Sequence, residues 1–208
     1  MSRRLYTFRP CLETDRYHVG MIETNDRIAG LAAELFHEHG ITTTGVDALS
    51  KAAGISKRTL YERFGSKDGL IVAAYEALDL PVFRMLTEAA EAASDTPRGQ
   101  LEAFFAQTET MIRMPDFRGC PFSNASAELA DSDHPAHKVV RRHKERIRRW
   151  LLRRARDAGA RKPEELTRQL MLVFAGAQAQ ALVEQSPRAA REARAIAATL
   201  LDATIPAR

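Results

Sequence analysis

The chain has 208 residues, of which 45% are hydrophobic, and its 31 Lys and Arg residues against 27 Asp and Glu residues leave a formal net charge of +4. That composition supplies enough apolar side chains for a packed core and argues against disorder, while so small a charge excess does not by itself indicate nucleic-acid binding. Because Cys11 and Cys120 form no disulfide or metal pattern and no run approaches the roughly 20 apolar residues that span a bilayer, we expect a soluble cytoplasmic protein.

Residues 1–23 follow no helical or strand period, and we expect them to form a loose N-terminal arm rather than a secretory signal. Met21 could even be the true start of translation. Arg3, Arg4 and Arg9 could contact DNA phosphates, but a mobile, solvated tail is the more frequent outcome for such a terminus.

The segment that begins at Thr24 is predicted to form an amphipathic helix. Thr24 or Asn25 can cap its start, and Gly40 ends it. Its apolar side chains recur every three or four residues and therefore share one face: Ile28, Leu31, Ala32, Leu35 and Phe36.

Proline and glycine residues divide the rest of the chain into further helices. These are predicted at 46–53, 57–63, from Lys67 onward, and at 98–113, 121–131, 135–158, 163–185 and 187–203. The helix from Lys67 is expected to bend or break near Pro81, because proline lacks the N–H that a helix needs. No alternating strand pattern of useful length occurs, so we expect an all-α fold of about nine helices.

The stretch 44–70 has the spacing of a helix-turn-helix. Gly54 tolerates the positive φ that ends a helix in so tight a turn. Val46 and Leu49 should face inward from the first helix, and Leu60 should anchor the second helix against it.

The second helix of this motif is predicted to point polar and basic side chains outward. Those able to touch DNA are Lys57, Arg58, Thr59, Tyr61 and Glu62. Ser56, at the helix start, leaves free backbone N–H groups that favour a phosphate. Residues 51–67 include five basic residues and one acidic residue, whereas 24–70 is balanced six to six, so the positive charge is local. Three helices could also cluster for packing alone, without binding DNA. Packing does not require the exposed set of Tyr61 with Lys57, Arg58 and Lys67.

The same stretch resembles the DNA-binding region of the TetR family of bacterial regulators. The matching positions are Leu35, Phe36, Gly40, 54–57, 59–61, Phe64, Ser66, Lys67 and Leu70. Gly45 stands where the family usually has a Ser or Thr helix cap, and Ser50 stands where alanine is usual. Glycine is a tolerable cap, so both departures leave the resemblance intact.

The resemblance implies DNA contacts at six positions. These are Thr44, Lys57, Arg58, Thr59, Tyr61 and Lys67. It further implies that Tyr61 and Lys67 hold phosphates, while the residues around Arg58 and Glu62 approach the bases.

The resemblance also divides the chain into an arm at 1–23, a DNA-binding domain at 24–70 and a ligand-binding and dimerisation domain at 71–208. It implies a homodimer in which the last two long helices pair with their copies. Helices 163–185 and 187–203 carry small and apolar residues that allow such close pairing, although a buried helix of a monomer would carry them too.

A pocket for a small-molecule effector is expected among the helices between residues 81 and 182. Such pockets are mostly apolar with a few placed polar groups, and for each residue taken singly core packing is the more frequent role. The candidate lining residues are Phe83, Leu86, Phe104, Phe105, Thr108, Met111, Phe117, Cys120, Phe122, Asn124, Trp150, Phe174 and Gln178.

The segment 119–124 looks like one found in a TetR subgroup at the start of a helix. Asn124 and Glu128, four residues apart, could present polar groups together. Cys120 could react with oxidants or electrophiles, and its more frequent alternative is a buried small apolar residue.

Two charged clusters are candidates for further sites. Helix 135–158 has ten basic residues and the single acidic Glu145 between 138 and 156; a solvated face is the default, and an anionic ligand or protein partner is the alternative. A second, acidic and histidine-containing cluster is explained equally well by a turn and a helix cap: Asp131, Asp133, His134 and His137. With no phosphate loop, zinc-protease helix or nucleophile elbow, we predict no metal, no cofactor and no catalysis.

The sequence therefore predicts a dimeric DNA-binding regulator of transcription. The resemblance implies a repressor that a small molecule releases from a palindromic operator, although activation would use the same contacts. Two alternatives remain: a ligand-independent DNA-binding architectural or cell-division factor, and a helical enzyme or small-molecule carrier.

Overall fold

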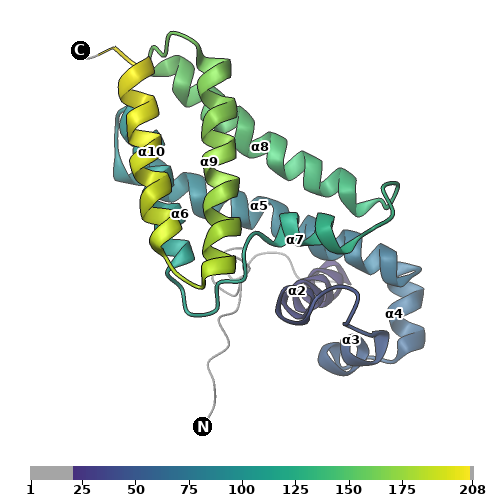
Figure 1. The fold of residues 1–208 in the computed structure, drawn as a ribbon. Helices are drawn as coiled ribbons and strands as arrows, with labels where there is room; N and C mark the ends of the chain where they lie inside the picture. The colour runs from purple at the N-terminus through teal and green to yellow at the C-terminus, as the bar shows by residue number, and fades with distance from the viewer. Residues whose placement is uncertain (1–20, 207–208) are drawn as a thin grey trace. The chain divides into compact units, whose positions relative to one another are not determined.

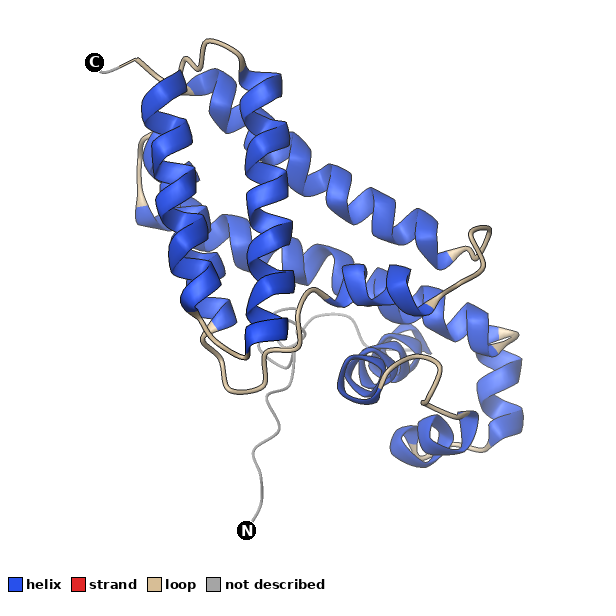
Figure 2. Ribbon diagram, viewed as in Figure 1, coloured by secondary structure: helices blue, strands red, loops and turns tan. Residues whose placement is uncertain are grey.

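The computed structural model describes residues 21–206, and within that range it contains nine α-helices and no strand (Figures 1 and 2). In chain order the helices are α2 (Met21–His39), α3 (Val46–Ala53), α4 (Lys57–Phe64), α5 (Lys67–Ala93), α6 (Pro97–Ile112), α7 (Pro121–Glu128), α8 (Ala136–Asp157), α9 (Pro163–Glu184) and α10 (Arg188–Thr204). The predicted all-α fold is confirmed. None of the described helices combines the length and apolar character that a membrane crossing requires.

Helix α2 starts earlier than the sequence pattern predicted. It begins at Met21 rather than near Thr24, so the last three residues of the predicted arm are helical. Asn25 is therefore inside the helix, where its side-chain oxygen accepts a hydrogen bond from Arg63 at 2.7 Å instead of capping the first turn. The rest of the arm, with its arginines and first cysteine, lies outside the described residues.

Helix α5 continues through Pro81, so of the bend or break expected there the break is wrong and the bend stays a prediction. Leu78 and Val82, on either side of the proline, are both buried. Core packing on both sides of Pro81 therefore offsets the lost backbone hydrogen bond. Helix α7 differs in the other direction, since it ends at Glu128, three residues short of its predicted end.

The described chain packs as two compact units. The first contains residues 21–82 and 121–143, and the second contains residues 83–120 and 144–206. Helices α5 and α8 each contribute residues to both units. The domain boundary predicted at residue 70 stays a prediction, because α5 runs through it.

The first unit places α2, α3 and α4 around a small apolar centre. Phe36 of α2, Leu49 of α3 and Leu60 of α4 are almost fully buried, as the spacing predicted for the inward face. Helix α3 ends where Gly54 adopts a left-handed conformation with φ of 69°. That conformation is accessible to glycine without a steric penalty, so the tight turn into α4 follows from the residue type.

The second unit is built around α6, α9 and α10 together with the C-terminal parts of α5 and α8. Helices α9 and α10 run side by side, and α10 also packs against α6 (Figure 1). Their alanine-rich faces are buried and bring the helix axes close together, as at Ala177, Ala193 and Ala197. The centre of this unit is aromatic and is described with the predicted ligand residues below.

Candidate nucleic-acid interface

Helix α4 has well-defined ends. The Ser56 hydroxyl accepts a hydrogen bond from the backbone N–H of Thr59 at 3.0 Å, which caps the first turn. At the other end, the N–H of Gly65 donates to the carbonyl of Tyr61 at 2.8 Å. Eight residues are therefore held as two helical turns, and the direction of each outward side chain is set by its position.

The outward face of α4 is polar, basic and open to solvent. The side chain of Arg58 is 88% exposed and that of Lys57 is 55% exposed. Tyr61, at 43%, is one of few large apolar residues exposed in the described chain, whereas Leu60 beside it is fully buried. A phenol and two cations on one exposed face suit contact with a phosphate backbone, since the cations supply affinity and the phenol can donate a hydrogen bond.

Two ion pairs organise this face. The carboxylate of Asp47, on α3, lies 2.5 Å from the ammonium of Lys57, and the Glu62 carboxylate lies 2.8 Å from the Arg58 guanidinium. The hydrogen bond to Asp47 is the main cause that raises the pKa of Lys57 above its ordinary value, with the charge of Asp47 adding to it. Lys57 is therefore a cation at neutral pH. Its partner in this structure is the Asp47 carboxylate, which lies where a DNA phosphate would bind if α4 contacted the duplex.

Two of the residues assigned by resemblance are engaged within the protein. Thr44 is buried, and its hydroxyl donates to the carbonyl of Gly40 at 2.6 Å. Since the Thr44 side chain is not accessible, we leave it out of the proposed interface. Lys67 is half-buried and donates to the carbonyl of Ile41 at 2.7 Å.

Sequence reasoning did not identify Asp47 as part of this surface. Asp47 and Lys57 are ten residues apart on different helices, so no helical spacing relates them. The only available signal was an acidic residue in the first turn of α3, and that position is equally explained by the positive end of the helix dipole.

Four of the predicted ligand-lining residues form a closely packed aromatic cluster in the second unit. Phe104 of α6 packs against Phe105, Trp150 and Phe174, with ring centroids 5.6, 5.6 and 5.0 Å away. All four side chains are buried. The indole N–H of Trp150 donates to Glu91 at 2.7 Å, and this hydrogen bond is the main cause that lowers the pKa of the Glu91 carboxyl.

Other predicted lining residues lie around this cluster. Leu86 belongs to the same core, and Phe83 and Met111 pack against it half-buried, while Phe117 packs against a second apolar cluster that contains Ile112.

The two polar candidates of the second unit are buried and bonded within their own helices. Thr108 donates to the carbonyl of Phe104, and Gln178 donates to the carbonyl of Phe174. These contacts are those of core residues, and a role in binding an effector stays a prediction.

The segment around α7 is divided between the two units. Phe122 belongs to the first unit, where its ring stacks on that of His143 with centroids 3.6 Å apart, and Asn124 lies on the same helix. The structure therefore assigns these two residues to a different unit from the other eleven candidates. Cys120, in the second unit, is buried, and the Lys144 ammonium lies 3.3 Å from its sulfur. Its reactivity stays a prediction.

The acidic and histidine-containing cluster forms a turn. The N–H of Asp133 donates to the Asp131 carboxylate at 2.9 Å, and the N–H of Ala136 donates to Nδ1 of His134 at 3.1 Å. These bonds fit the reading of this segment as a turn and helix start. In the described part of the chain, no three His, Cys, Asp or Glu residues group in a way that could hold a metal ion.

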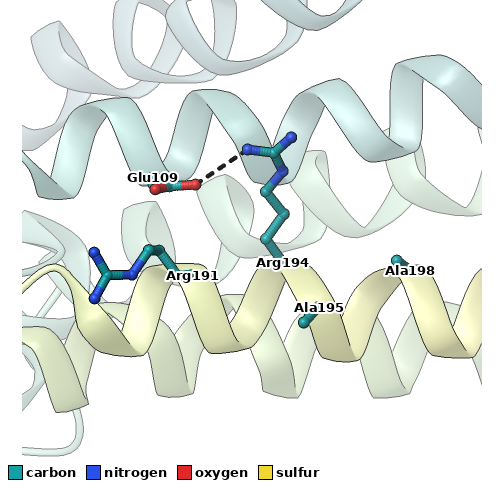
Figure 3. A pocket seen from close by; sticks show the side chains of 5 residues that line it. All are labelled: Glu109, Arg191, Arg194, Ala195 and Ala198. Carbon is teal, nitrogen blue, oxygen red and sulfur yellow. Dashed lines mark hydrogen bonds and ion pairs between the residues drawn. The ribbon is translucent and has the colours of Figure 1, made fainter.

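A surface hollow of about 370 Å³ lies between α6 and α10 (Figure 3). Its lining residues are Glu109, Arg191, Arg194, Ala195 and Ala198. Arg194 reaches across it to the Glu109 carboxylate at 3.3 Å. The stronger bond from Arg113, at 2.6 Å, is the first cause that lowers the pKa of Glu109. None of the predicted ligand residues borders this hollow.

A helix-turn-helix with an exposed cationic second helix, within an all-α chain, defines a DNA-binding regulator. The comparisons with known proteins agree. The family model for bacterial regulatory proteins of the tetR family matches residues 28–74, and the model for a tetracyclin repressor-like C-terminal domain matches residues 97–197. Together they cover well over half of the chain. The chain belongs to the TetR family of transcriptional regulators.

Solved structures and a curated relative support this assignment. A TetR-family regulator from Streptomyces coelicolor is 29% identical with a TM-score of 0.80, over 88% of this chain and 90% of that one. A regulator of the same type from Streptomyces avermitilis is 34% identical with a TM-score of 0.71, over 87% and 97%. The transcriptional regulator AcuR of Cereibacter sphaeroides is 33% identical, but the match spans only 49% of this chain and 46% of AcuR.

Proposed function

We propose that this protein is a homodimeric, ligand-responsive repressor that reads a palindromic operator with two copies of helix α4. Each α4 enters the major groove, and the two half-site centres lie about one helical turn apart, roughly 34–36 Å or slightly more. The observation that carries the proposal is the exposed set on α4, with Arg58 and Lys57 beside Tyr61, opposite the fully buried Leu60.

Pairing of two chains is supported by the exposed apolar residues of the last two helices. Leu172 is 74% exposed and Val183 is 78% exposed on α9, and Leu182 and Ile196 add to the apolar surface of α9 and α10. Large apolar side chains exposed together mark interaction surfaces in proteins. A second copy of the chain is the occupant that the two-fold symmetry of a palindromic operator requires.

Control by a small molecule is supported by the family assignment and by the separate second unit. We infer that effector binding moves α5, which starts at Lys67 directly after the reading helix and continues into the second unit. Coupling of this kind typically amounts to about 1–3 kcal/mol, which lowers operator affinity by about 5–150-fold.

One observation favours a second candidate function, that of a ligand-independent DNA-binding factor. Four predicted lining residues, Phe104, Phe105, Trp150 and Phe174, pack on one another. A unit whose apolar centre is already filled can serve dimerisation alone. Titrating the operator-bound protein with small-molecule libraries separates the two candidate functions. Release of the operator by any class of compound favours the ligand-responsive repressor.

The double variant Lys57→Ala/Tyr61→Ala tests whether helix α4 reads the operator. Operators are first selected by the wild-type protein from a library of random-sequence duplexes, and affinity is then measured by fluorescence anisotropy. We expect operator affinity to fall by about tenfold or more, because contacts to the duplex contribute roughly 1–3 kcal/mol each. Lys162→Ala, which removes an exposed cation from the second unit, is the control. A folded double variant with unchanged affinity would contradict the proposal.

A further inference from the structure

The turn between α2 and α3 is held by side chains from distant parts of the chain. Gly40 has φ of +89°, and its N–H closes the last turn of α2 by donating to the carbonyl of Phe36 at 2.9 Å. The next residues lead directly into α3, the helix against which α4 packs. The path of this turn therefore sets the direction in which the helix-turn-helix leaves α2.

The carboxylate of Glu128 binds the backbone of this turn. Its Oε2 accepts a hydrogen bond from the N–H of Ile41 at 2.6 Å and a second from the N–H of Thr42 at 3.3 Å. Hydrogen bonds that an ionised carboxylate accepts are shorter and stronger than neutral ones. A Cβ atom at Gly40 would lie only 3.0 Å from the same oxygen, so the close approach and the positive φ both favour glycine there.

The carbonyl groups of the same turn are also bound. Lys67, the first residue of α5, donates to the carbonyl of Ile41 at 2.7 Å, and Thr44 donates to the carbonyl of Gly40 at 2.6 Å. The turn thus has an anion on its N–H groups and a cation on a carbonyl. The cation, Lys67, belongs to the first turn of α5, and the anion, Glu128, belongs to the last turn of α7. Neither belongs to α2 or α3, the helices that the turn connects.

Helix α7 is itself fixed within the first unit. The ring of Phe122 stacks on His143 of α8 and meets the ring of Tyr75 of α5 edge-on, with centroids 5.7 Å apart. In the chain, α7 follows directly on Cys120, the residue at which the second unit's first segment ends. Helix α7 therefore packs within the first unit, and its last residue is the one that binds the turn.

We propose that Glu128 is a positioning residue for the helix-turn-helix, and that its carboxylate, by binding the N–H groups of Ile41 and Thr42, fixes the direction in which α3 and then α4 follow α2. The inference rests on the proposed reading of DNA by α4 and names a residue that positions this helix. Glu128 touches no DNA in this mechanism, since it acts through the direction of α3 and hence of α4.

The sign of the effect on DNA affinity separates positioning from simple electrostatics. Removing a carboxylate from a DNA-binding unit strengthens phosphate contacts, so electrostatics alone predicts that Glu128→Ala binds every duplex more tightly. Loss of positioning predicts the reverse for the operator. Contacts to phosphates in random DNA do not depend on accurate placement of α4, so affinity for random DNA should not fall.

The experiment compares Glu128→Ala, Glu128→Gln and the charge control Glu38→Ala by anisotropy on the selected operator and on a random duplex. Glu38 is an exposed carboxylate of α2 in the same unit. We expect about tenfold weaker operator binding for Glu128→Ala with unchanged or stronger binding to random DNA. Glu128→Gln, which keeps one acceptor oxygen, should lose less, and Glu38→Ala should lose nothing.

Circular dichroism melting identifies a variant that does not fold. If Glu128→Ala does not fold, the test rests on Glu128→Gln, whose affinity for the operator is compared with its affinity for the random duplex in the same way. Equal or tighter operator binding by the folded Glu128 variants overturns the inference, as does equal weakening on both duplexes. A wild-type protein that selects no sequence from the library overturns the proposed function instead, so the two failures are distinguishable.

Discussion

The ammonium group of Lys57 lies 2.5 Å from the carboxylate of Asp47, which joins the second helix of the helix-turn-helix to the first. Both side chains are exposed, so solvent screens the pair and its contribution to stability is small. We expect its consequence to be functional, because the Asp47 carboxylate takes the position beside Lys57 that a DNA phosphate would take in the proposed interface.

We expect Asp47→Asn to increase affinity for DNA of any sequence. The change removes a negative charge from the interface and leaves Lys57 without its acidic partner. The slope of log affinity against log salt should become steeper by about one unit, as for one added phosphate contact. Anisotropy titrations at several salt concentrations measure both effects. Asp95→Asn, an exposed change in the second unit, is the control, and an unchanged slope would show that Asp47 does not compete with phosphate.

The exposed apolar surface of α9 gives a prediction about assembly. Leu172→Glu/Val183→Glu should produce monomers at concentrations where the wild-type chain is a dimer, because unpaired carboxylates at a buried interface cost several kcal/mol, or about a hundredfold or more in dimer affinity. Analytical ultracentrifugation measures this, and operator affinity should fall in parallel.

The matched control for this surface is Arg153→Glu, an exposed charge change on α8. If the double variant sediments as the wild-type chain does, α9 is not the pairing surface and the proposed dimer is wrong.

The Trp150–Glu91 hydrogen bond predicts a pH-dependent contribution to stability. Because folding lowers the pKa of Glu91 below its ordinary value of 4.5, the ionised form stabilises the folded chain. That stabilisation is present above pH about 4.5 and is lost as the pH falls through the lower, folded-state value. The Glu91 side chain is 41% exposed, so we expect no more than about 1 kcal/mol.

Glu91→Gln should therefore melt a few degrees below the wild-type chain at pH 7, and the difference should shrink at pH about 3.5. Glu88→Gln on the same helix, whose partner Arg84 is 3.7 Å away in solvent, is the control. A melting difference that stays constant with pH would mean that ionisation of Glu91 does not contribute.

Much of the helix-turn-helix could be predicted from local sequence. The left-handed conformation of Gly54 and the burial of Leu60 depend on residue type and on spacing within a few residues. Such features are set by sterics and by hydrogen bonds between near neighbours, so a short stretch of sequence contains them. The same holds for the all-α fold class, since helical periodicity is local.

The contacts that complete the site were decided by the tertiary structure. The sequence indicated that Glu128 and Asn124 share a helix face. The hydrogen bond that Glu128 accepts from Ile41 joins residues 87 positions apart in the chain, and the sequence did not indicate it. The burial of Thr44 and the place of Phe122 in the first unit likewise depend on how whole helices pack. A residue's sequence neighbours determine whether it is helical and which way it faces. Its partner across the core depends on how whole helices pack, and no local period records that.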